Sequence, residues 1–331
     1  MPRQCVSDLA PNARVDGVFA VKSKTLSEYK QKPGKFMTLT LADRTGEIAA
    51  RIWDGAEEAD ARIAAGDVVV VEGRVDEYRG TPQLVVESIV VAEEGSYDLG
   101  ELVPRSERST QELELWLQAA VEEVTDPWLR RLLDLFVEDE QFKTRLLTAP
   151  GAKSLHHAHV GGLLEHTLSV VHIVRSVCHL YPQMNADLLI TGALLHDIGK
   201  LEELEGLLAV DYSDEGNFLG HVVLTDRMVC EKLRMIPDFP PHLANLLSHM
   251  LLSHHGEREW GAPVVPKTME ACALHYADNM DARLQGFRRV IEAGAPSGAS
   301  WSPYVSSYQR TLYVGPNRVA DEPEASGGPG E

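Results

Sequence analysis

Leu194-Leu-His-Asp-Ile-Gly-Lys200 is the stretch that decides how this chain is interpreted, because it contains an adjacent histidine and aspartate within an apolar run. A carboxylate such as that of Asp197 is costly to bury unless it is paired or coordinated to a metal. Imidazole nitrogens and carboxylate oxygens together suit the transition metals Mn²⁺, Fe²⁺, Co²⁺ and Zn²⁺. The stretch therefore predicts a metal site that includes His196 and Asp197.

Further candidate ligands lie on both sides of this pair. His166 precedes it, and His221, the His254-His255 doublet and Asp278 follow it. Any one of these histidines alone is more simply explained as an ordinary core or surface residue. Enzymes that hydrolyse phosphodiesters commonly use two metals a few Å apart, since one holds the attacking oxygen and the other the leaving oxygen. The order H…HD…H…HH…D therefore predicts a metal-dependent phosphohydrolase.

The segments around these residues resemble known motifs of the HD-domain superfamily of metal-dependent phosphohydrolases. More narrowly, they are similar to the YhaM-type 3′→5′ exoribonucleases. The similar segments are His156-His157-Ala-His-Val-Gly-Gly-Leu-Leu-Glu-His166-Thr, Gly220-His221, Ser253-His254-His255-Gly-Glu257 and Leu274-His-Tyr-Ala-Asp278-Asn-Met-Asp281. The resemblance covers roughly residues 1 to 315, because that family also has an OB-fold before its HD domain.

The resemblance implies two divalent ions per chain, with Mn²⁺ as the first candidate and Fe²⁺, Co²⁺ or Zn²⁺ as alternatives. On the family pattern, the ligands of one ion are His166, His196, Asp197 and Asp278. The second ion would take His221, His254 and His255, and the carboxylate of Asp197 would bridge the two ions because it has two oxygens. Adjacent helical residues diverge by about 100°, so whether both histidines of the doublet are ligands stays open.

Lys200 is a second candidate catalytic residue beside Asp197. If one helix runs from Leu188 to Leu201, Lys200 lies one turn beyond His196 on the same face. Its ammonium would then neutralise phosphoryl oxygens in the transition state. The competing explanation is a cation that complements the dipole at the end of that helix.

The chain predicts several domains, an N-terminal β-barrel followed by an all-α HD domain. Short alternating runs begin at Val15, Phe36, Ile48, Val68 and Gln83, with turn signals between them. Five such strands, with a helical patch between the third and fourth, match an OB-fold barrel. The expected ranges are 1–94 for the OB-fold, 95–108 for a polar linker, 109–314 for the HD domain and 315–331 for a disordered acidic tail.

The first hairpin of the barrel combines cations with aromatic residues. The members of this set are Lys22, Lys24, Tyr29, Lys30, Lys32, Lys35 and Phe36. Such a loop can follow a nucleic-acid backbone while its aromatic faces stack on bases, although a solvated hairpin tip explains the same composition. Trp53 on the third strand suits either the barrel core or a stacking surface. His157, Lys267 and Arg310 are further candidates for contact with nucleic acid.

The overall charge limits the kind of partner. A formal net charge of −19 argues against a broadly basic nucleic-acid surface and predicts dependence on divalent cations to attract a polyanion. No apolar run approaches the roughly 20 residues of a membrane span. The start of the chain has no secretory pattern, and the 4 cysteines are scattered. These features predict a cytoplasmic enzyme without a membrane partner.

The leading prediction is a metal-dependent 3′→5′ exonuclease on single-stranded RNA, with single-stranded DNA as a second candidate substrate. The alternative is a phosphodiesterase of a small nucleotide or cyclic dinucleotide, with the OB-fold as a regulatory or oligomerisation module. The His254-His255 doublet occurs in cyclic-dinucleotide phosphodiesterases of the superfamily, but no Gly-Tyr-Pro tripeptide lies near it here. A non-catalytic nucleic-acid sensor is disfavoured by the complete ligand set. A homo-oligomer is left open.

Overall fold

The computed structural model describes residues 4–78, 81–103, 106, 108–153, 159–294 and 299–315. The chain forms two compact units, residues 1–278 and residues 279–331. In the described part, no helix combines the length and apolar character needed to cross a membrane. The predicted contact residue His157 and positions 316–331 of the predicted tail lie outside the described residues.

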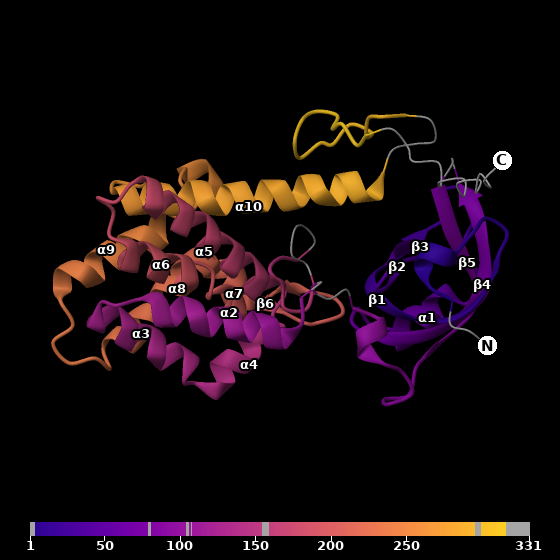
Figure 1. Cartoon of the computed structure of the whole chain (residues 1–331). Helices are drawn as coiled ribbons and strands as arrows, with labels where there is room; N and C mark the ends of the chain where they lie inside the picture. The colour runs from indigo at the N-terminus through magenta and orange to yellow at the C-terminus, as the bar shows by residue number, and fades with distance from the viewer. Residues whose placement is uncertain are drawn as a thin grey trace, which may run out of the picture. The chain divides into compact units, whose positions relative to one another are not determined.

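The first part of the chain is a closed five-stranded barrel (Figure 1). Its strands are β1 (Arg14–Glu28), β2 (Lys35–Asp43), β3 (Gly46–Ile52), β4 (Val68–Tyr78) and β5 (Thr81–Val91). β1 pairs antiparallel with both β2 and β4, and the barrel closes through parallel pairing of β3 with β5. Helix α1 (Ala56–Arg62) lies between β3 and β4, so the predicted OB-fold arrangement is confirmed.

Alternation of side chains fills the interior of the barrel. On β2, Met37, Leu39 and Leu41 are all buried, because every second residue of a strand points to the same face. A bulge interrupts the pairing of β4 with β5 at Gly73. A Cβ atom there would lie 2.3 Å from the carbonyl oxygen of Val85. Glycine is therefore required for the two strands to approach at this point.

The predicted linker after the barrel has apolar contacts of its own. A short turn, η2 (Leu99–Glu101), is followed by Leu102 and Val103, both of which are buried in a cluster with Ala20 and Val68. This part of the connector therefore packs on the barrel wall, and is not a fully solvated segment.

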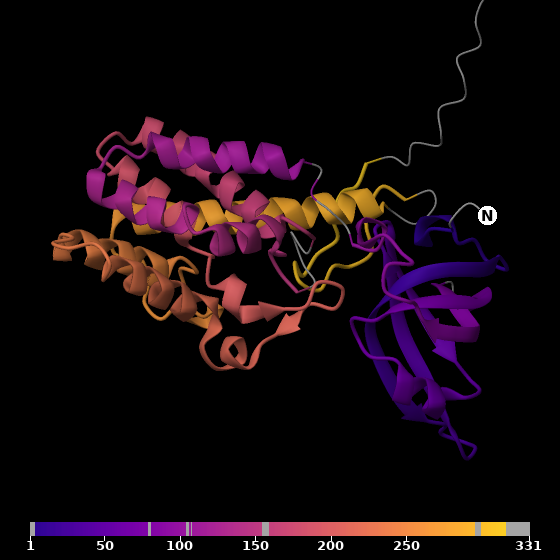
Figure 2. The ribbon, with the colours of Figure 1, turned by 90° about the horizontal axis from the view of Figure 1, so that it is seen from below.

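The remaining elements are mainly helices, as predicted. They are α2 (Thr110–Glu123), α3 (Pro127–Val137), α4 (Glu140–Thr148), α5 (Gly162–Leu180), α6 (Ala186–Leu195), α7 (Lys200–Glu203), α8 (Asp214–Leu233), α9 (Pro241–Ser253) and α10 (Met269–Ala293). Short elements also occur: η1 (Val6–Asp8) before the barrel, a hairpin of β6 (Leu204–Glu205) with β7 (Asp211–Tyr212), and η3 (Arg258–Trp260). Figure 2 shows the helical bundle from a second side.

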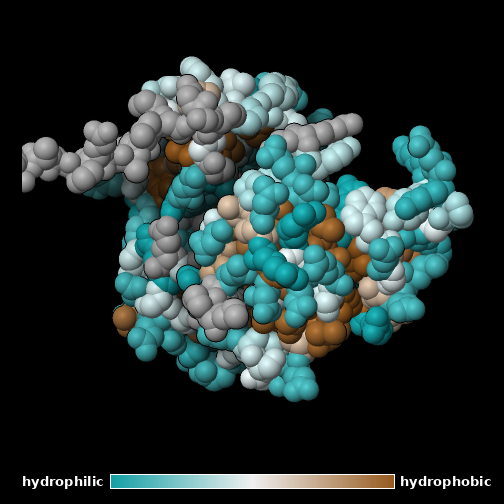
Figure 3. All heavy atoms as spheres, turned by 90° about the vertical axis from the view of Figure 1, so that its right-hand side faces the viewer, coloured by the Kyte–Doolittle hydropathy of each residue, from teal (hydrophilic) through white to brown (hydrophobic). Residues whose placement is uncertain are grey.

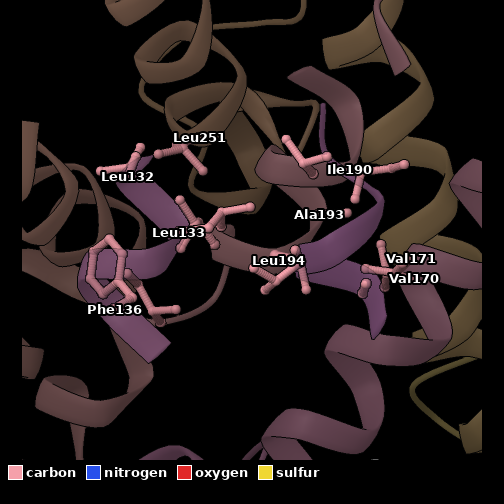
Figure 4. Close-up of a cluster of buried hydrophobic side chains, with 14 of the residues drawn as sticks. Leu132, Leu133, Phe136, Val170, Val171, Ile190, Ala193, Leu194 and Leu251 are labelled. Carbon is pink, nitrogen blue, oxygen red and sulfur yellow. The ribbon is translucent and has the colours of Figure 1, made fainter. Parts of the chain in front are cut away.

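Helix α6 lies in the middle of this domain. From Leu188 onward every residue of α6 is buried, and the helix contacts α3, α5 and α9, as expected of a buried helix. Figure 4 shows Ile190, Ala193 and Leu194 of α6 in the apolar cluster that also contains Val170 of α5 and Leu251 of α9. Each fully buried aliphatic side chain contributes about 1.5–3 kcal/mol. This packing fixes the end of α6, where His196 and Asp197 follow.

Residues 279–315 contain the end of α10 and the described segment 299–315. In that segment, Trp301 pairs with Tyr313 and Val305 pairs with Arg310 as isolated bridges. The ring of Tyr308 packs edge-on against Phe287, with 4.8 Å between the ring centroids.

Figure 3 shows hydrophilic side chains in teal spread among apolar ones in brown over one face of the molecule.

Candidate metal centre

The helical domain brings all seven predicted ligands into one cluster. His166 lies on α5, His221 on α8 and Asp278 on α10, whereas the two other groups follow the ends of α6 and α9. The ligand atoms of His166, His196 and Asp197 lie within 4.8 Å of one another, as do those of His221, His254 and His255. The cluster therefore has two halves.

Asp197 lies between the two halves, and each of its oxygens faces one of them. Oδ2 lies 3.4 Å from Nε2 of His196 and 3.6 Å from Nε2 of His166. Oδ1 lies 3.4 Å from Nε2 of His221 and 3.7 Å from Nε2 of His254. This arrangement is the one expected of a carboxylate that bridges two ions.

Asp278 belongs to the first half. Its Oδ1 lies 3.2 Å from Nε2 of His166 and 4.0 Å from Nε2 of His196. Burial raises the pKa of Asp278, but hydrogen bonding to His166 and the charges of His166 and His196 lower it below the usual value. Asp278 is therefore an ionised acceptor.

The predicted helix from Leu188 to Leu201 is wrong in its second half. α6 ends at Leu195, and His196 and Asp197 lie in a turn before α7. Contacts with α8 hold this turn. The N–H of Gly199 donates to the hydroxyl of Thr225 at 2.9 Å, and that hydroxyl donates to the carbonyl of His196 at 3.1 Å. Lys200 therefore reaches the cluster from the first residue of α7, directly after this turn, and not from a continuation of α6.

The helix ends also fix the orientation of two histidine rings. Nδ1 of His196 donates to the carbonyl of Ala193 at 2.9 Å, and Nδ1 of His254 donates to the carbonyl of Leu251 at 2.7 Å. Both acceptors are carbonyls of a last helical turn, which have no partner within the helix. Similarly, Nδ1 of His255 lies 2.8 Å from the carbonyl of Trp260. Carbonyls only accept hydrogen bonds, so in the neutral rings Nε2 keeps its lone pair.

The Nε2 atoms of the cluster lie close to one another, which bears on whether a metal fits. The Nε2 atoms of His221 and His255 are 3.1 Å apart, and those of His166 and His196 are 3.3 Å apart. Nε2 of His254 is buried without a hydrogen-bond partner in the described structure. Two lone pairs at such distances repel each other unless a cation or proton lies between them. A set of nitrogen and carboxylate donors fits a divalent transition metal, and the cluster is a candidate divalent metal site.

Both histidines of the doublet reach the cluster. Their ring centroids lie 4.5 Å apart, and the chain leaves α9 after Ser253 and turns at Gly256, whose φ is +80°. A Cβ atom on Gly256 would lie 2.2 Å from the ring of His275, so glycine is required there. Burial lowers the pKa of His254 and of His255, which favours the neutral form that binds metals.

Lys200 contacts the predicted bridging carboxylate directly. Its Nζ lies 2.7 Å from Oδ2 of Asp197. Burial alone would raise the pKa of Asp197, but the charges of Lys200 and His196 hold it well below its usual value. Burial lowers the pKa of Lys200, but the charge and hydrogen bond of Asp197 outweigh burial and raise it. Both groups are therefore charged.

Glu203 is buried beside the centre and was not predicted from the sequence. Its Oε1 accepts a hydrogen bond from the backbone N–H of His221 at 2.9 Å, and its carboxylate also contacts the imidazole. Burial raises the pKa of Glu203, but the hydrogen bonds and charge of His221 outweigh this effect. The pKa is therefore below its usual value, and the carboxylate is ionised. Because acidic residues neighbour Glu203 in the sequence, composition alone does not distinguish it from a solvated residue.

On the barrel, the predicted aromatic residues form a cluster with Trp53. Ring centroids lie 5.2 Å apart for Tyr29 and Phe36, 6.0 Å for Tyr29 and Trp53, and 5.3 Å for Phe36 and Trp53. Nζ of Lys32 lies 4.1 Å from the centroid of Tyr29. Arg51 lies over Phe36 and Trp53, at 5.6 and 5.5 Å. Arg51 was not predicted, although it lies on β3 two residues before Trp53, which directly follows that strand, and a two-residue spacing favours the same face.

The predicted cations differ in their surroundings. Lys24 pairs with Asp60 at 2.8 Å and Lys35 pairs with Glu57 at 2.7 Å, both with carboxylates of α1. Lys30 and Lys32 are exposed at the hairpin tip, and Lys22 is half-buried on β1. Elsewhere, Lys267 and Arg310 are also exposed, and neither belongs to the metal cluster.

Comparison with known proteins agrees with this geometry. The HD domain family model matches residues 163–283, and the model of the OB-fold nucleic acid binding domain matches residues 18–92. The chain is thus an OB-fold followed by an HD domain. It is 32% identical over 286 residues to the 3′-5′ exoribonuclease YhaM of Oceanobacillus iheyensis, covering 85% of this chain and 88% of that one. The YhaM of Bacillus subtilis is 32% identical over 287 residues, covering 86% and 89%. This chain belongs to the YhaM family of 3′-5′ exoribonucleases.

Proposed function

We propose that this protein is a metal-dependent 3′→5′ exonuclease that hydrolyses the phosphodiester bonds of single-stranded RNA, with single-stranded DNA as a second candidate substrate. The observation that supports this best is the position of Asp197, whose two oxygens face two separate sets of histidines. The names of the relatives support the direction of cleavage and the choice of RNA.

The proposed centre holds two divalent ions. The first would be bound by His166, His196, Asp197 and Asp278, and the second by His221, His254, His255 and Asp197. Mn²⁺ is the leading candidate and Fe²⁺, Co²⁺ and Zn²⁺ are alternatives, because the donors are imidazoles and carboxylates without a thiolate. When bound, such ions supply Lewis acidity and activate water near neutral pH.

The protein's own groups have separate roles in this proposal. Asp197 holds both ions, and the histidines present their Nε2 lone pairs in fixed directions. Lys200 is a charged group at the edge of the cluster, where its ammonium would neutralise the phosphoryl oxygens of the substrate. Its support is the 2.7 Å contact with Asp197.

The barrel would bind the RNA strand. Bases would stack on the cluster of Tyr29, Phe36 and Trp53, while Lys30 and Lys32 contact phosphates. The division of the chain into residues 1–94, 95–108 and 109–314 belongs to the same proposal, with binding in the first range and hydrolysis in the last.

The decisive experiment uses a 5′-labelled oligoribonucleotide and protein stripped of metal by a chelator. Adding Mn²⁺ should produce a ladder of labelled products that shorten from the 3′ end. Early release of a labelled mononucleotide would contradict the direction. Hydrolysis of a cyclic dinucleotide by protein that leaves the RNA intact would favour the small-nucleotide alternative, for which the His254-His255 doublet is the supporting observation.

A further inference from the structure

Glu203 makes two kinds of contact with a single residue, His221. One carboxylate oxygen accepts a hydrogen bond from the backbone N–H of His221 at 2.9 Å. The two oxygens also lie 3.0 and 2.9 Å from Nδ1 of the imidazole. The side chains are 11% and 13% exposed. One buried carboxylate thus fixes both the main chain and the ring of the same residue.

The backbone contact lies at a break in α8. Gly220, immediately before His221, has φ 70° and ψ 153°, a conformation that is essentially restricted to glycine. N–H groups of the turn after such a break need acceptors from outside the helix. Glu203 is that acceptor for His221, and a carboxylate is also favoured by the helix dipole at this position. The start of the second helical segment is therefore set by Glu203.

The ring contact determines which nitrogen of His221 faces the cluster as a ligand. An ionised carboxylate only accepts, so Nδ1 carries the proton and Nε2 keeps its lone pair. That Nε2 lies 3.1 Å from Nε2 of His255 and 3.4 Å from Oδ1 of Asp197. The other Nδ1 acceptors in the described cluster, at His196, His254 and His255, are neutral carbonyls. His221 therefore has the strongest Nδ1 partner among these four histidines.

We infer that Glu203 is a positioning residue, which holds His221 in the orientation and tautomer that bind the second ion of the centre. A carboxylate on the far nitrogen of a metal-binding histidine fixes the tautomer and raises the basicity of the ligand. The inference rests on the two-ion site proposed above. Loss of Glu203 should weaken the histidine-rich half of the cluster and leave the half of His166 and Asp278 intact.

Glu203→Gln tests this inference with almost no change of volume. An amide has one accepting oxygen and a donating NH₂ group. If its oxygen remains with the backbone N–H of His221, its nitrogen faces Nδ1 and favours the tautomer with the proton on Nε2. Loss of such partners typically weakens metal binding about 10- to 100-fold. Glu202→Gln is the matched control, because that neighbouring carboxylate pairs with Arg145 at 2.8 Å.

Three measurements on the full chain are needed. The proteins are loaded with Mn²⁺ and excess metal is removed by desalting. Wild type and Glu202→Gln should then retain two ions per chain, and Glu203→Gln should retain one. Titration of metal-free protein with Mn²⁺ should show weakening of only one of two sites. Nitrogen-15 NMR of metal-free protein should show His221 shifting towards the Nε2-protonated tautomer.

The results separate this inference from the proposed function. Wild-type protein that binds fewer than two ions would overturn both. Wild-type protein with two ions, and a Glu203→Gln variant with the same content, affinity and tautomer, would overturn only the role of Glu203. Loss of both ions together with a large drop in the melting temperature of the metal-free variant would show general structural support, and would also overturn the positioning role.

Discussion

The carboxylate of Asp197 and the ammonium of Lys200 lie 2.7 Å apart, and their side chains are only 4% and 14% exposed. A buried charge pair is costly to break from one side, because the remaining charge loses its partner. Both oxygens of this carboxylate also face histidines of the cluster. The ammonium of Lys200, in contrast, has no lone pair and cannot be a metal ligand. Removing the two residues should therefore have different effects.

Asp197→Asn should abolish both metal binding and hydrolysis. The amide keeps the volume but removes the charge and one of the two oxygens that face the separate halves. Loss of a residue that only supports a metal ligand already lowers metal affinity or activity about 10- to 100-fold. Loss of the ligand itself should therefore lower activity on RNA by at least roughly 100-fold. Metal analysis and the 5′-labelled RNA assay measure both effects. Asp134→Asn is the control, because Asp134 is a half-buried carboxylate of the same domain that pairs with Arg130. Near-complete activity in Asp197→Asn would show that the centre does not use this bridge.

Lys200→Met should keep the metals and lose activity. Methionine replaces the alkyl part of the side chain without its charge, and groups that stabilise developing charge contribute about 10²- to 10³-fold to the rate. The expected result is wild-type metal content with a turnover rate lowered by roughly that factor. Loss of metal in proportion to activity would show instead that Lys200 acts only by holding Asp197.

The sequence predicted most of the fold because its patterns depend on neighbouring residues. The strands of the barrel follow from the two-residue alternation seen at Met37, Leu39 and Leu41. The metal cluster was predicted from residue types and a family resemblance, and the structure brings those residues together. Neither kind of signal depends on contacts between distant segments.

The differences arise where such distant contacts decide the structure. The helix ends before His196 because Gly199 and Thr225, on different elements, hold the turn. Lys24 and Lys35 looked like free cations, but the fold pairs them with the acidic helix α1. Glu203 lies in an acidic segment that resembles a solvated surface, and only its burial reveals its contact with His221.

Trp53→Ala should weaken the binding of long single-stranded RNA. A stacked base contributes about 1–3 kcal/mol, so the dissociation constant should rise roughly 10- to 100-fold. Hydrolysis of a small chromogenic phosphodiester should not change, because that substrate has no further bases to stack on the barrel. Trp116→Ala is a matched control, since Trp116 is 39% exposed and Trp53 is 37% exposed. Equal losses on long and short substrates would point to misfolding of the barrel.

Charge removal at the hairpin tip should reduce the salt dependence of RNA binding. Each phosphate contact contributes about 0.7 to the slope of log K against log salt for single strands, so Lys30→Gln with Lys32→Gln should lower it by about 1.4. The double variant of Lys24 and Lys35 is the comparison. Both of these lysines already have carboxylate partners, and their removal should change the slope less. A larger change of slope in the variant of Lys24 and Lys35 would indicate that RNA binds nearer to α1.

The last prediction concerns stability and pH, and involves Asp139 at the start of α4. Its Oδ1 accepts from the N–H of Phe142 at 3.1 Å, and its Oδ2 accepts from Nζ of Lys232 at 3.0 Å. Hydrogen bonds from Phe142 and Lys232 lower the pKa of Asp139 in the folded protein. A lowered folded pKa means that the charge stabilises the fold above the usual pKa of aspartate. This contribution is lost as pH falls through the folded pKa.

Asp139→Asn should therefore be less stable than wild type at pH 7, and the difference should shrink as pH falls below the usual pKa of aspartate. Asparagine retains the helix cap, so only the ion pair with Lys232 is lost, which at 39% exposure of Asp139 contributes at most about 1 kcal/mol. Asp139→Ala should lose roughly another 1 kcal/mol with the cap, at every pH. Urea unfolding from pH 7 to pH 3 with a chelator present measures both differences. A gap between wild type and Asp139→Asn that stays constant over this range would show that the ion pair does not contribute.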